Sequence, residues 1–297
     1  MKTATSKLEL RFTARDAGAT RRAFAQRYLL TALLILIAVV WLSPALWALV
    51  TSLKTADDVI KSVPYWLPYP LSLESYASVF ATDRTGGIAR PVLNSAIYAV
   101  LTTVLTLVIC VITAFPLARM RFPGRDVVFA IVVGSIMVPD IVTLVPLFLL
   151  MAQLGWLNSY QALIVPNLAS AFGVFLLRQF FLSLPSEMED AARIDGANSL
   201  QILTRVLLPL SQPALVALTI FTVRGTWNDF TWPLIVMTSE KMYTLPVALA
   251  LLHTDYSAEA FGPIMAGAVI SALPILAVFL VANRYIVEGV QLSGLKG

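Results

Sequence analysis

The residues best placed to do chemistry are a few charged, amide and aromatic side chains that interrupt long apolar stretches. Asp140 lies in one stretch, and Arg224 and Asp229 lie in another, with Trp227 and Asn228 between them. A charge near the centre of a membrane costs about 2.5–3.5 kcal/mol on insertion scales, so such residues usually face a cavity or a partner. The indole face offers a stacking surface, and the amide can hydrogen-bond to hydroxyl groups. These five residues are therefore candidates for a translocation path.

A structural role is the alternative for the same residues. Arg224 and Asp229 are five positions apart, which is about 140° around an α-helix, so they are poor partners unless that helix is unwound. Polar contacts that lock helices together, or that lock two membrane subunits together, would also explain them. Asn94, at the start of another apolar stretch, is a further path candidate, although a helix cap would explain it equally well.

Segment 183–210 carries acidic residues beside alanines, a pattern that predicts a short exposed helix. Ser186 and Glu189 have the spacing of a capping box, in which each side chain accepts a backbone N–H of the first turn. Glu187 and Asp190 add negative charge at the same end, where it complements the helix dipole. The exposed face would be small and weakly apolar, formed by Met188, Ala191 and Ala192.

The sequence also marks where this helix ends and a second one begins. Gly196 follows Asp195 and predicts a stop in the left-handed conformation that glycine tolerates. A second helix is expected to start at Asn198 or Ser199 and to end before Pro209. Its buried residues would be Ile202, Leu203, Val206 and Leu207. A capped helix–turn–helix between two apolar stretches indicates a docking site, and an ordinary solvated connection is the alternative.

Several enzyme classes are excluded by what the chain lacks. It has no Gly-x-x-x-x-Gly-Lys-[Ser/Thr] run, which is the usual loop for ATP phosphates. With one cysteine, Cys110, and one histidine, His253, it cannot build a metal site or a nucleophile–base pair of the usual kinds. We expect no catalytic residue, no metal and no cofactor bound by this chain.

The elements that must position these residues are membrane spans. Apolar residues make up 58% of the 297 residues and charged residues only 13%, against about 45–50% and about 25% in soluble domains. A spanning helix needs about 20 apolar residues. Six stretches qualify: 28–51, 92–118, 127–154, 160–181, 213–237 and 263–286. Pro139 and Pro146 should make the third span discontinuous, because each proline removes a backbone hydrogen bond.

The distribution of lysine and arginine predicts the orientation of the spans. Alternate loops that share one side of the membrane carry 15 basic residues, and the opposite loops carry five. Because basic residues favour the cytoplasm, both termini and the loop 183–210 are expected there. The expected organisation is a basic cytoplasmic tail (1–27), a six-span domain (28–288) and a short cytoplasmic C-terminal tail (289–297).

The motif from Glu189 to Ala197, Glu-Asp-Ala-Ala-Arg-Ile-Asp-Gly-Ala, followed by Leu-Leu-Pro-Leu at 207–210, resembles the EAA loop of binding-protein-dependent ABC importer permeases. The match holds at the two alanines, the glycine and the proline, whereas Asp190 stands where glutamate is usual. Segments 227–234, 243–246 and 284–297 are similar to the carbohydrate-uptake subfamily, specifically to the second, shorter permease of transporters of the maltose type.

This resemblance implies the type I ABC importer permease fold, all α-helical, with a cytoplasmic EAA coupling loop at 183–210. It makes these the coupling residues: Glu187, Glu189, Asp190, Ala191, Ala192, Asp195, Gly196, Ala197 and Pro209. The path candidates stay Asn94, Asp140, Arg224, Trp227, Asn228 and Asp229. The implied partners are a second permease subunit, a dimer of an ATP-binding subunit that uses ATP and Mg, an extracytoplasmic solute-binding protein and membrane lipid, with no nucleic acid.

The implied solute is a sugar or oligosaccharide, with glycerol 3-phosphate or a polyol as the alternative. A rival of another class is an ion-coupled secondary transporter in which Asp140 or Asp229 titrates. Such folds often contain inverted repeats, and none is evident here.

Overall fold

The computed structural model describes the backbone of residues 3–60, 69–81, 87–252 and 261–294, and the side chains of 26–55, 57–59, 69–81, 87–251 and 261–282. Within these ranges every regular element is helical, which confirms the all-α fold class. The helices are α1 (Thr3–Ser52), α2 (Ala56–Ile60), α3 (Glu74–Ala81), α4 (Ala89–Arg119), α5 (Arg125–Ser135), α6 (Asp140–Gln153), α7 (Tyr160–Ile164), the 3-10 turn η1 (Val165–Asn167), α8 (Ala171–Ser183), α9 (Glu187–Ile194), α10 (Ser199–Ile202), the π-helical turn η2 (Leu203–Leu207), α11 (Leu208–Leu210), α12 (Gln212–Trp227), α13 (Thr231–Val236), the 3-10 turn η3 (Glu240–Met242), α14 (Leu245–Leu252) and α15 (Phe261–Gly294).

Three described helices are long and apolar enough to cross a membrane by themselves: α1, α4 and α15. Three pairs of helices joined at a bend pass the same test together, so the described chain holds three to six candidate spans. The predicted third span corresponds to α5 with α6, the fourth to α7 with α8, and the fifth to α12 with α13. The short helices α2, α3 and α14 lie between predicted spans and were not expected.

The third predicted span is broken at one of its two prolines. The axes of α5 and α6 differ by 96°, and the chain leaves α5 through three i→i−3 hydrogen bonds donated by Ile136, Met137 and Val138. Pro139 then adopts an extended conformation with ψ 134°. A proline also disfavours the α region for the residue before it, which here is Val138. The expectation at Pro146 was wrong, because α6 continues through it and loses only the hydrogen bond that proline cannot donate.

Helix α4 is more polar on its buried face than on its exposed face. Buried residues of its first half include Tyr98, Thr102 and Thr106, one per turn. Its exposed face carries large apolar side chains such as Val104 and Val108. Acyl chains solvate apolar side chains but cannot hydrogen-bond to polar ones, so the polar face must be satisfied inside the bundle. This distribution matches a span surrounded by lipid.

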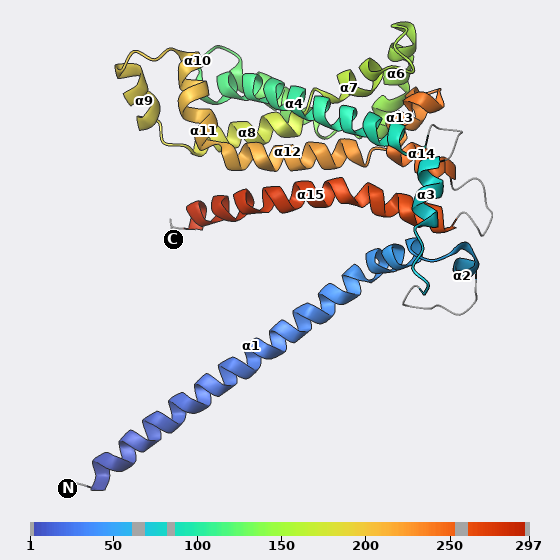
Figure 1. The fold of residues 1–297 in the computed structure, drawn as a ribbon. Coiled ribbons are helices and arrows are strands. Elements are labelled where there is room, and N and C mark those ends of the chain that lie inside the picture. Colours follow the sequence, from blue (N-terminus) through green and yellow to red (C-terminus); the bar gives the residue numbers. More distant parts are fainter. Residues whose placement is uncertain (1–2, 61–68, 82–86, 253–260, 295–297) are drawn as a thin grey trace.

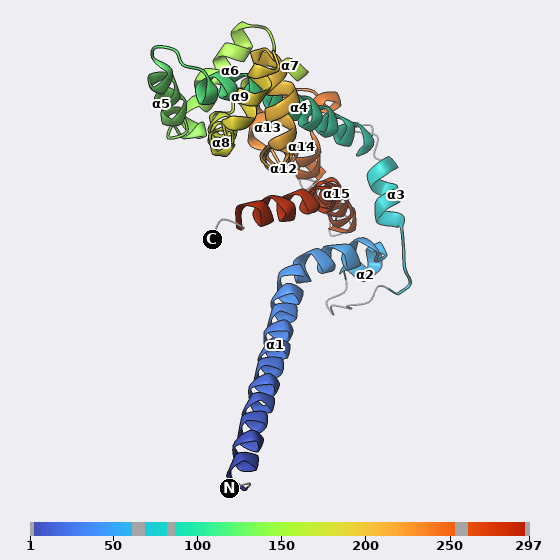
Figure 2. The same ribbon diagram turned by 90° about the vertical axis from the view of Figure 1, so that its left-hand side faces the viewer.

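Helices α4, α8 and α12 lie side by side, and α15 runs along α12 (Figure 1). The ends of α1 and α15 nearest the two termini lie towards the same side as α9, whereas α2, α3 and α14 lie at the other end. Much of α1 extends away from the other helices in both views (Figures 1 and 2), and none of its apolar window is buried.

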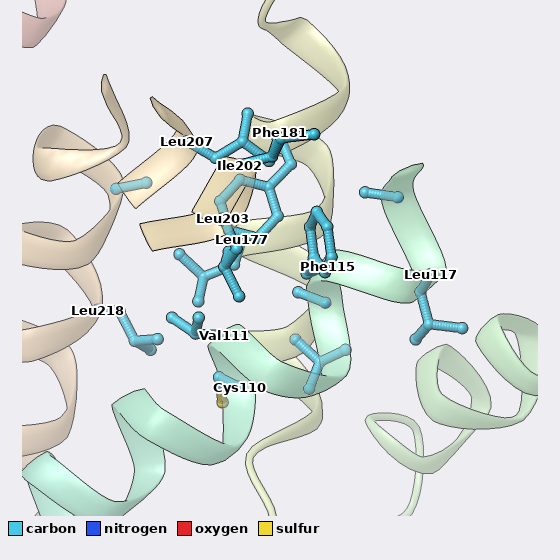
Figure 3. Close-up of a cluster of buried hydrophobic side chains, with 14 residues drawn as sticks. Cys110, Val111, Phe115, Leu117, Leu177, Phe181, Ile202, Leu203, Leu207 and Leu218 are labelled. Atoms are coloured by element: carbon cyan, nitrogen blue, oxygen red, sulfur yellow. The ribbon is translucent and has the colours of Figure 1, made fainter. Parts of the chain in front are cut away.

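A cluster of buried apolar side chains joins α4 and α8 to the segment that follows α9 (Figure 3). Phe115 of α4, Leu177 and Phe181 of α8, and Ile202 of α10 all contribute to it. Beside this cluster, Gly173 lets α8 approach α4 closely, because a Cβ there would lie 2.6 Å from the sulfur of Cys110. This cluster therefore lies where the loop 183–210 meets the spans, and two further apolar clusters lie elsewhere in the described chain.

Candidate functional site

A polar cavity of about 660 Å³ lies between α4, α6, α8 and α12. Two of the predicted path residues, Asp140 and Asp229, line it from opposite segments of the chain. Hydroxyl and amide groups make up most of the rest of its polar lining: Tyr98, Thr102, Thr106, Thr143, Asn167, Ser170, Thr222, Thr226 and Thr231. Phe172, Phe221 and Trp232 add aromatic surface. Polar groups with a few rings are the lining that a hydroxyl-rich solute requires.

Asp229 is held in place by a hydrogen-bonded chain of side chains. Helix α12 ends at Trp227, so Asp229 lies in the unwound segment before α13. The hydroxyl of Tyr98 donates to Oδ2 of Asp229 at 3.0 Å, and Nδ2 of Asn167 donates to the Tyr98 oxygen at 2.9 Å. Sequence reasoning missed Tyr98 and Asn167, although both are polar groups inside apolar stretches, the same signal that singled out Asp229.

Three other path candidates lie outside the lining of this cavity. Arg224 is exposed on α12, and Asn228 is exposed and donates from Nδ2 to the Arg224 carbonyl at 3.1 Å, which closes the end of the helix. Trp227 is only 4% exposed and its indole N–H donates to the Ser271 carbonyl at 2.9 Å. The stacking surface expected of Trp227 is therefore not available in this structure, because its ring packs between α12 and α15.

Asn94 forms a junction between three parts of the chain. It is fully buried inside α4, whose N-cap is Ile88, so the alternative of a simple cap is wrong, and it lies outside the lining of the cavity. Its Nδ2 donates to the carbonyls of Lys241 and Tyr243 at 3.0 and 2.8 Å, and its Oδ1 accepts from the Tyr160 hydroxyl at 2.7 Å. With its amide oxygen and nitrogen both engaged, Asn94 fastens the chain before α14 and the start of α7 to α4.

Helix α9 occupies the position predicted for the first loop helix, but the predicted capping box is wrong. Ser186 has helical backbone angles and its side chain accepts no capping hydrogen bond. Glu189 instead lies 2.7 Å from Nε of Arg119 on α4, with both side chains largely buried. A guanidinium close by neutralises a buried carboxylate better than one backbone N–H would, because it carries a full charge.

The end of α9 follows the prediction from Gly196. This glycine has φ +84°, and its N–H donates to the Arg193 carbonyl at 3.0 Å. The N–H of Ala197 donates to the Ala192 carbonyl at 2.9 Å, and the two bonds together form a Schellman motif. The left-handed conformation at Gly196 therefore turns the chain from α9 into α10.

The second loop helix starts as predicted, with Asn198 as its N-cap, and it carries the capping box that α9 lacks. The Asn198 side chain accepts from the N–H of Gln201 at 2.9 Å, and Oε1 of Gln201 accepts from the N–H of Asn198 at 2.8 Å. The expected end before Pro209 was wrong. Helical structure continues to Leu210 through the π-helical η2, whose wider turn precedes the proline and leaves Val206 only half-buried.

The outer surface of α9 is exposed and of mixed character. Glu187, Ala191 and Asp195 are exposed, Met188 is 44% exposed and Ile194 is 86% exposed. A hollow lies between this helix and α11 and includes Ala192 and Pro209 in its lining. Ala192 and Ala197 are half-buried and pack against the cluster of Figure 3, whereas Asp190 is exposed. The structure thus brings the loop residues together on one projecting unit.

No group of three or more His, Cys, Asp or Glu that could hold a metal ion occurs among the described residues. The carboxylates of the cavity are Asp140 and Asp229, and those of α9 are Glu187, Glu189 and Asp190.

Known proteins resemble this chain over most of its length. The family described as "Binding-protein-dependent transport system inner membrane component" matches residues 106–291. The chain is 34% identical to the arabinooligosaccharides transport system permease protein AraQ of Bacillus subtilis, over 91% of this chain and 96% of AraQ. It is also 34% identical to the trehalose/maltose transport system permease protein MalG of Thermococcus litoralis, over 92% and 98%. A crystal structure of a bacterial ABC transporter involved in the import of the acidic polysaccharide alginate aligns with TM-score 0.78 and 27% identity, over 90% of this chain and 97% of that chain.

Proposed function

This chain belongs to the family of binding-protein-dependent transport system inner membrane components, and from that premise we propose that it forms half of the path of an ATP-driven sugar or oligosaccharide importer. The relatives named above are permeases for arabinooligosaccharides and for trehalose and maltose. The chain covers almost their whole length, so the resemblance concerns the whole permease and not one motif.

The observation that carries the choice of solute is the chemistry of the polar cavity. Its described lining contains two carboxylates, several hydroxyls and four aromatic side chains, and no lysine or arginine. Proteins usually bind phosphate groups with arginine or lysine, because charge-assisted hydrogen bonds are the stronger ones. A neutral sugar therefore fits this half of the path better than glycerol 3-phosphate, and a polyol remains the closest alternative.

The proposed energy source is a separate pair of ATP-binding subunits that use ATP and Mg. The exposed surface of α9 supports this, because Ala191 is small enough to let a partner approach closely, and Met188 and Ile194 offer it apolar contact. A second permease subunit completes the path, an extracytoplasmic binding protein delivers the solute, and membrane lipid surrounds the apolar faces. The rival ion-coupled transporter would use Asp140 or Asp229, but it gives no role to α9.

The proposed orientation puts both termini and α9 in the cytoplasm. The excess of basic residues in the loops on that side supports it, and so does the common direction of α9 and the two terminal helix ends (Figure 1). Cysteine labelling of Ile194→Cys from either side of sealed vesicles measures it. Reaction only from the cytoplasmic side is expected, and reaction only from the outside would reverse the orientation.

Reconstitution tests the function as a whole. This chain, its companion permease, the ATP-binding subunit and the binding protein are placed in vesicles and supplied with labelled arabinotriose, maltose, trehalose or glycerol 3-phosphate. We expect uptake of a neutral sugar that requires ATP and survives a protonophore, and no ATP hydrolysis by this chain alone. Uptake without ATP that collapses with the protonophore would establish the ion-coupled rival, and uptake of glycerol 3-phosphate alone would establish the other solute.

A further inference from the structure

The inference concerns how α9 is attached to the rest of the chain. Glu189 is the one acidic residue of α9 that is buried, at 5% exposure, while its neighbours Glu187 and Asp190 are exposed. Its Oε1 lies 2.7 Å from Nε of Arg119, and their side chains are 7% and 12% exposed. The N–H direction does not align with the carboxylate, so the contact is an ion pair and not an aligned hydrogen bond. One edge of α9 is thus fixed by charge to the last residue of α4.

The same arginine also fixes the turn that leads into α9. Nη2 of Arg119 donates to the Leu184 carbonyl at 2.7 Å, between α8 and α9. Arg178 of α8 in turn donates to the Leu117 carbonyl of α4 at 3.0 Å. Two guanidinium groups therefore join the ends of α4 and α8 at the base of α9, and α9 cannot shift at this edge without moving the end of α4 or breaking the ion pair.

Ala192 of α9 packs against the apolar cluster, and the opposite surface of the helix is exposed to a partner. Met188, Ala191 and Ile194 lie on its exposed surface, and the chain after Gly196 turns away into α10. A force applied to this exposed surface would be transmitted to the rest of the chain through the buried edge of α9. Because Glu189 is the buried charged contact at that edge, it is the point at which the force would reach α4.

Helix α4 connects this edge to the polar cavity. It is a single helix from Ala89 to Arg119, and three of its residues, Tyr98, Thr102 and Thr106, line the cavity. At 1.5 Å per residue, these lie about 20–30 Å from Arg119 along the axis. Apart from the one hydrogen bond that Pro116 cannot donate, α4 is continuous and carries a displacement over that distance, whereas α5 and α6 meet at a bend of 96° and the chain leaves the helix between α12 and α13.

We propose that the Arg119–Glu189 ion pair is the link by which movement of α9, driven by the ATP-binding subunits, is passed to α4 and so to the cavity. Glu189 and Arg119 are positioning residues in this scheme: they touch neither ATP nor solute. The proposal rests on the function proposed above, and it assigns Glu189 to the inner edge of α9 and not to the surface that meets the ATP-binding subunit.

The test follows the cavity directly and needs no knowledge of the solute. Thr143 is exposed and lines the cavity from α6, so Thr143→Cys in a Cys110→Ala background reports its accessibility to a water-soluble maleimide. The reconstituted complex is labelled with and without trapping by ATP, Mg and orthovanadate. We expect trapping to change the labelling rate several-fold, and Glu189→Gln to abolish that change while the ATP-binding subunits still co-purify in full.

Rescue distinguishes a link from a merely structural role. The exchange Arg119→Glu with Glu189→Arg keeps an opposite pair at the same place but removes the donor to the Leu184 carbonyl, so it should restore part of the labelling change. Arg119→Lys keeps the charge, but an ammonium group cannot reach both the carboxylate and the Leu184 carbonyl as a guanidinium does. This single mutant should therefore retain part of the labelling change. Asp126→Asn is the matched control, because it neutralises a nearby carboxylate that is 77% exposed, and it should keep the full change.

Each other outcome decides the question. A full labelling change in Glu189→Gln, or no rescue by the exchanged pair, would overturn the proposed link. Loss of the ATP-binding subunits from Glu189→Gln would make Glu189 a docking residue, which also overturns it. If trapping changes nothing in the background protein that contains Glu189, the proposed function itself fails, and that result is separate from the behaviour of the mutants.

Discussion

Replacing Gly196 tests whether backbone conformation sets the geometry of the loop between α9 and α10. Its φ of +84° lies in the left-handed region, which costs an ordinary L-residue about 1–2 kcal/mol and asparagine less. A Cβ at this position would meet no atom within 4 Å, so within this chain the backbone is the main source of the cost. One to two kcal/mol corresponds to roughly 5–30-fold in an equilibrium constant.

We therefore expect a graded series at this position. Gly196→Asn should be nearly normal, Gly196→Ala should weaken binding of the ATP-binding subunit about 5–30-fold, and Gly196→Val should weaken it further, because a β-branched residue is a clear outlier at positive φ. The measurement is the dissociation constant of the ATP-binding subunit from the purified pair of permeases, with membrane insertion as the control.

Two results would refute this reasoning. Normal binding with Gly196→Val would mean that the loop geometry does not depend on this conformation. Binding equally weak with asparagine, alanine and valine would mean that the partner touches the glycine itself, since the backbone cost differs among the three residues.

Four further changes follow from contacts described above. Asn94→Ala should lower the stability of the chain by about 3 kcal/mol, because two backbone carbonyls and a tyrosine hydroxyl lose their partner; thermal unfolding in detergent measures it, and an unchanged midpoint contradicts it. Trp227→Phe should lower the free energy of unfolding by about 1 kcal/mol, because it removes one buried N–H donor. Uptake should be unchanged, because the ring packs outside the cavity. Asp229→Leu should reduce uptake while the complex assembles, and Asp229→Asn should retain more uptake because it keeps an acceptor; full uptake by both mutants would show that the carboxylate is dispensable. Ala192→Asp should reduce the amount of ATP-binding subunit that co-purifies, because it puts an unpaired charge against the apolar cluster on which α9 packs; normal recovery would show that this packing does not set the position of α9 for docking.

Features that depend on local sequence were predicted well. The apolar runs that became α4 and α15 needed only length and composition, and the stop at Gly196 needed only the absence of a Cβ. The break at Pro139 likewise follows from the steric restriction that a proline places on the residue before it. In each case the cause lies within a few residues of the effect.

Features that depend on distant partners were not predictable in the same way. The spacing of Ser186 and Glu189 satisfied a capping box, yet the fold brings Arg119 from another helix to the carboxylate, and the charge takes precedence. Trp227 has the composition of a binding surface, but its environment is decided by α15, far along the chain. The continuation through Pro209 depends on a widened turn that the sequence does not signal.

The hydrogen bonds of Asn94 and Ser95 also constrain the order in which the protein can be completed. The Asn94 amide bonds to carbonyls 147 and 149 positions later, and the Ser95 hydroxyl accepts from an N–H 150 positions later. At about 5–20 residues per second, synthesis of that length takes about 7–30 s. During that interval, newly inserted α4 lacks these three backbone partners. Water, lipid headgroups or the insertion machinery must then satisfy the two side chains, so the end of α4 that carries Asn94 is the place where a slowed ribosome would prolong an immature state.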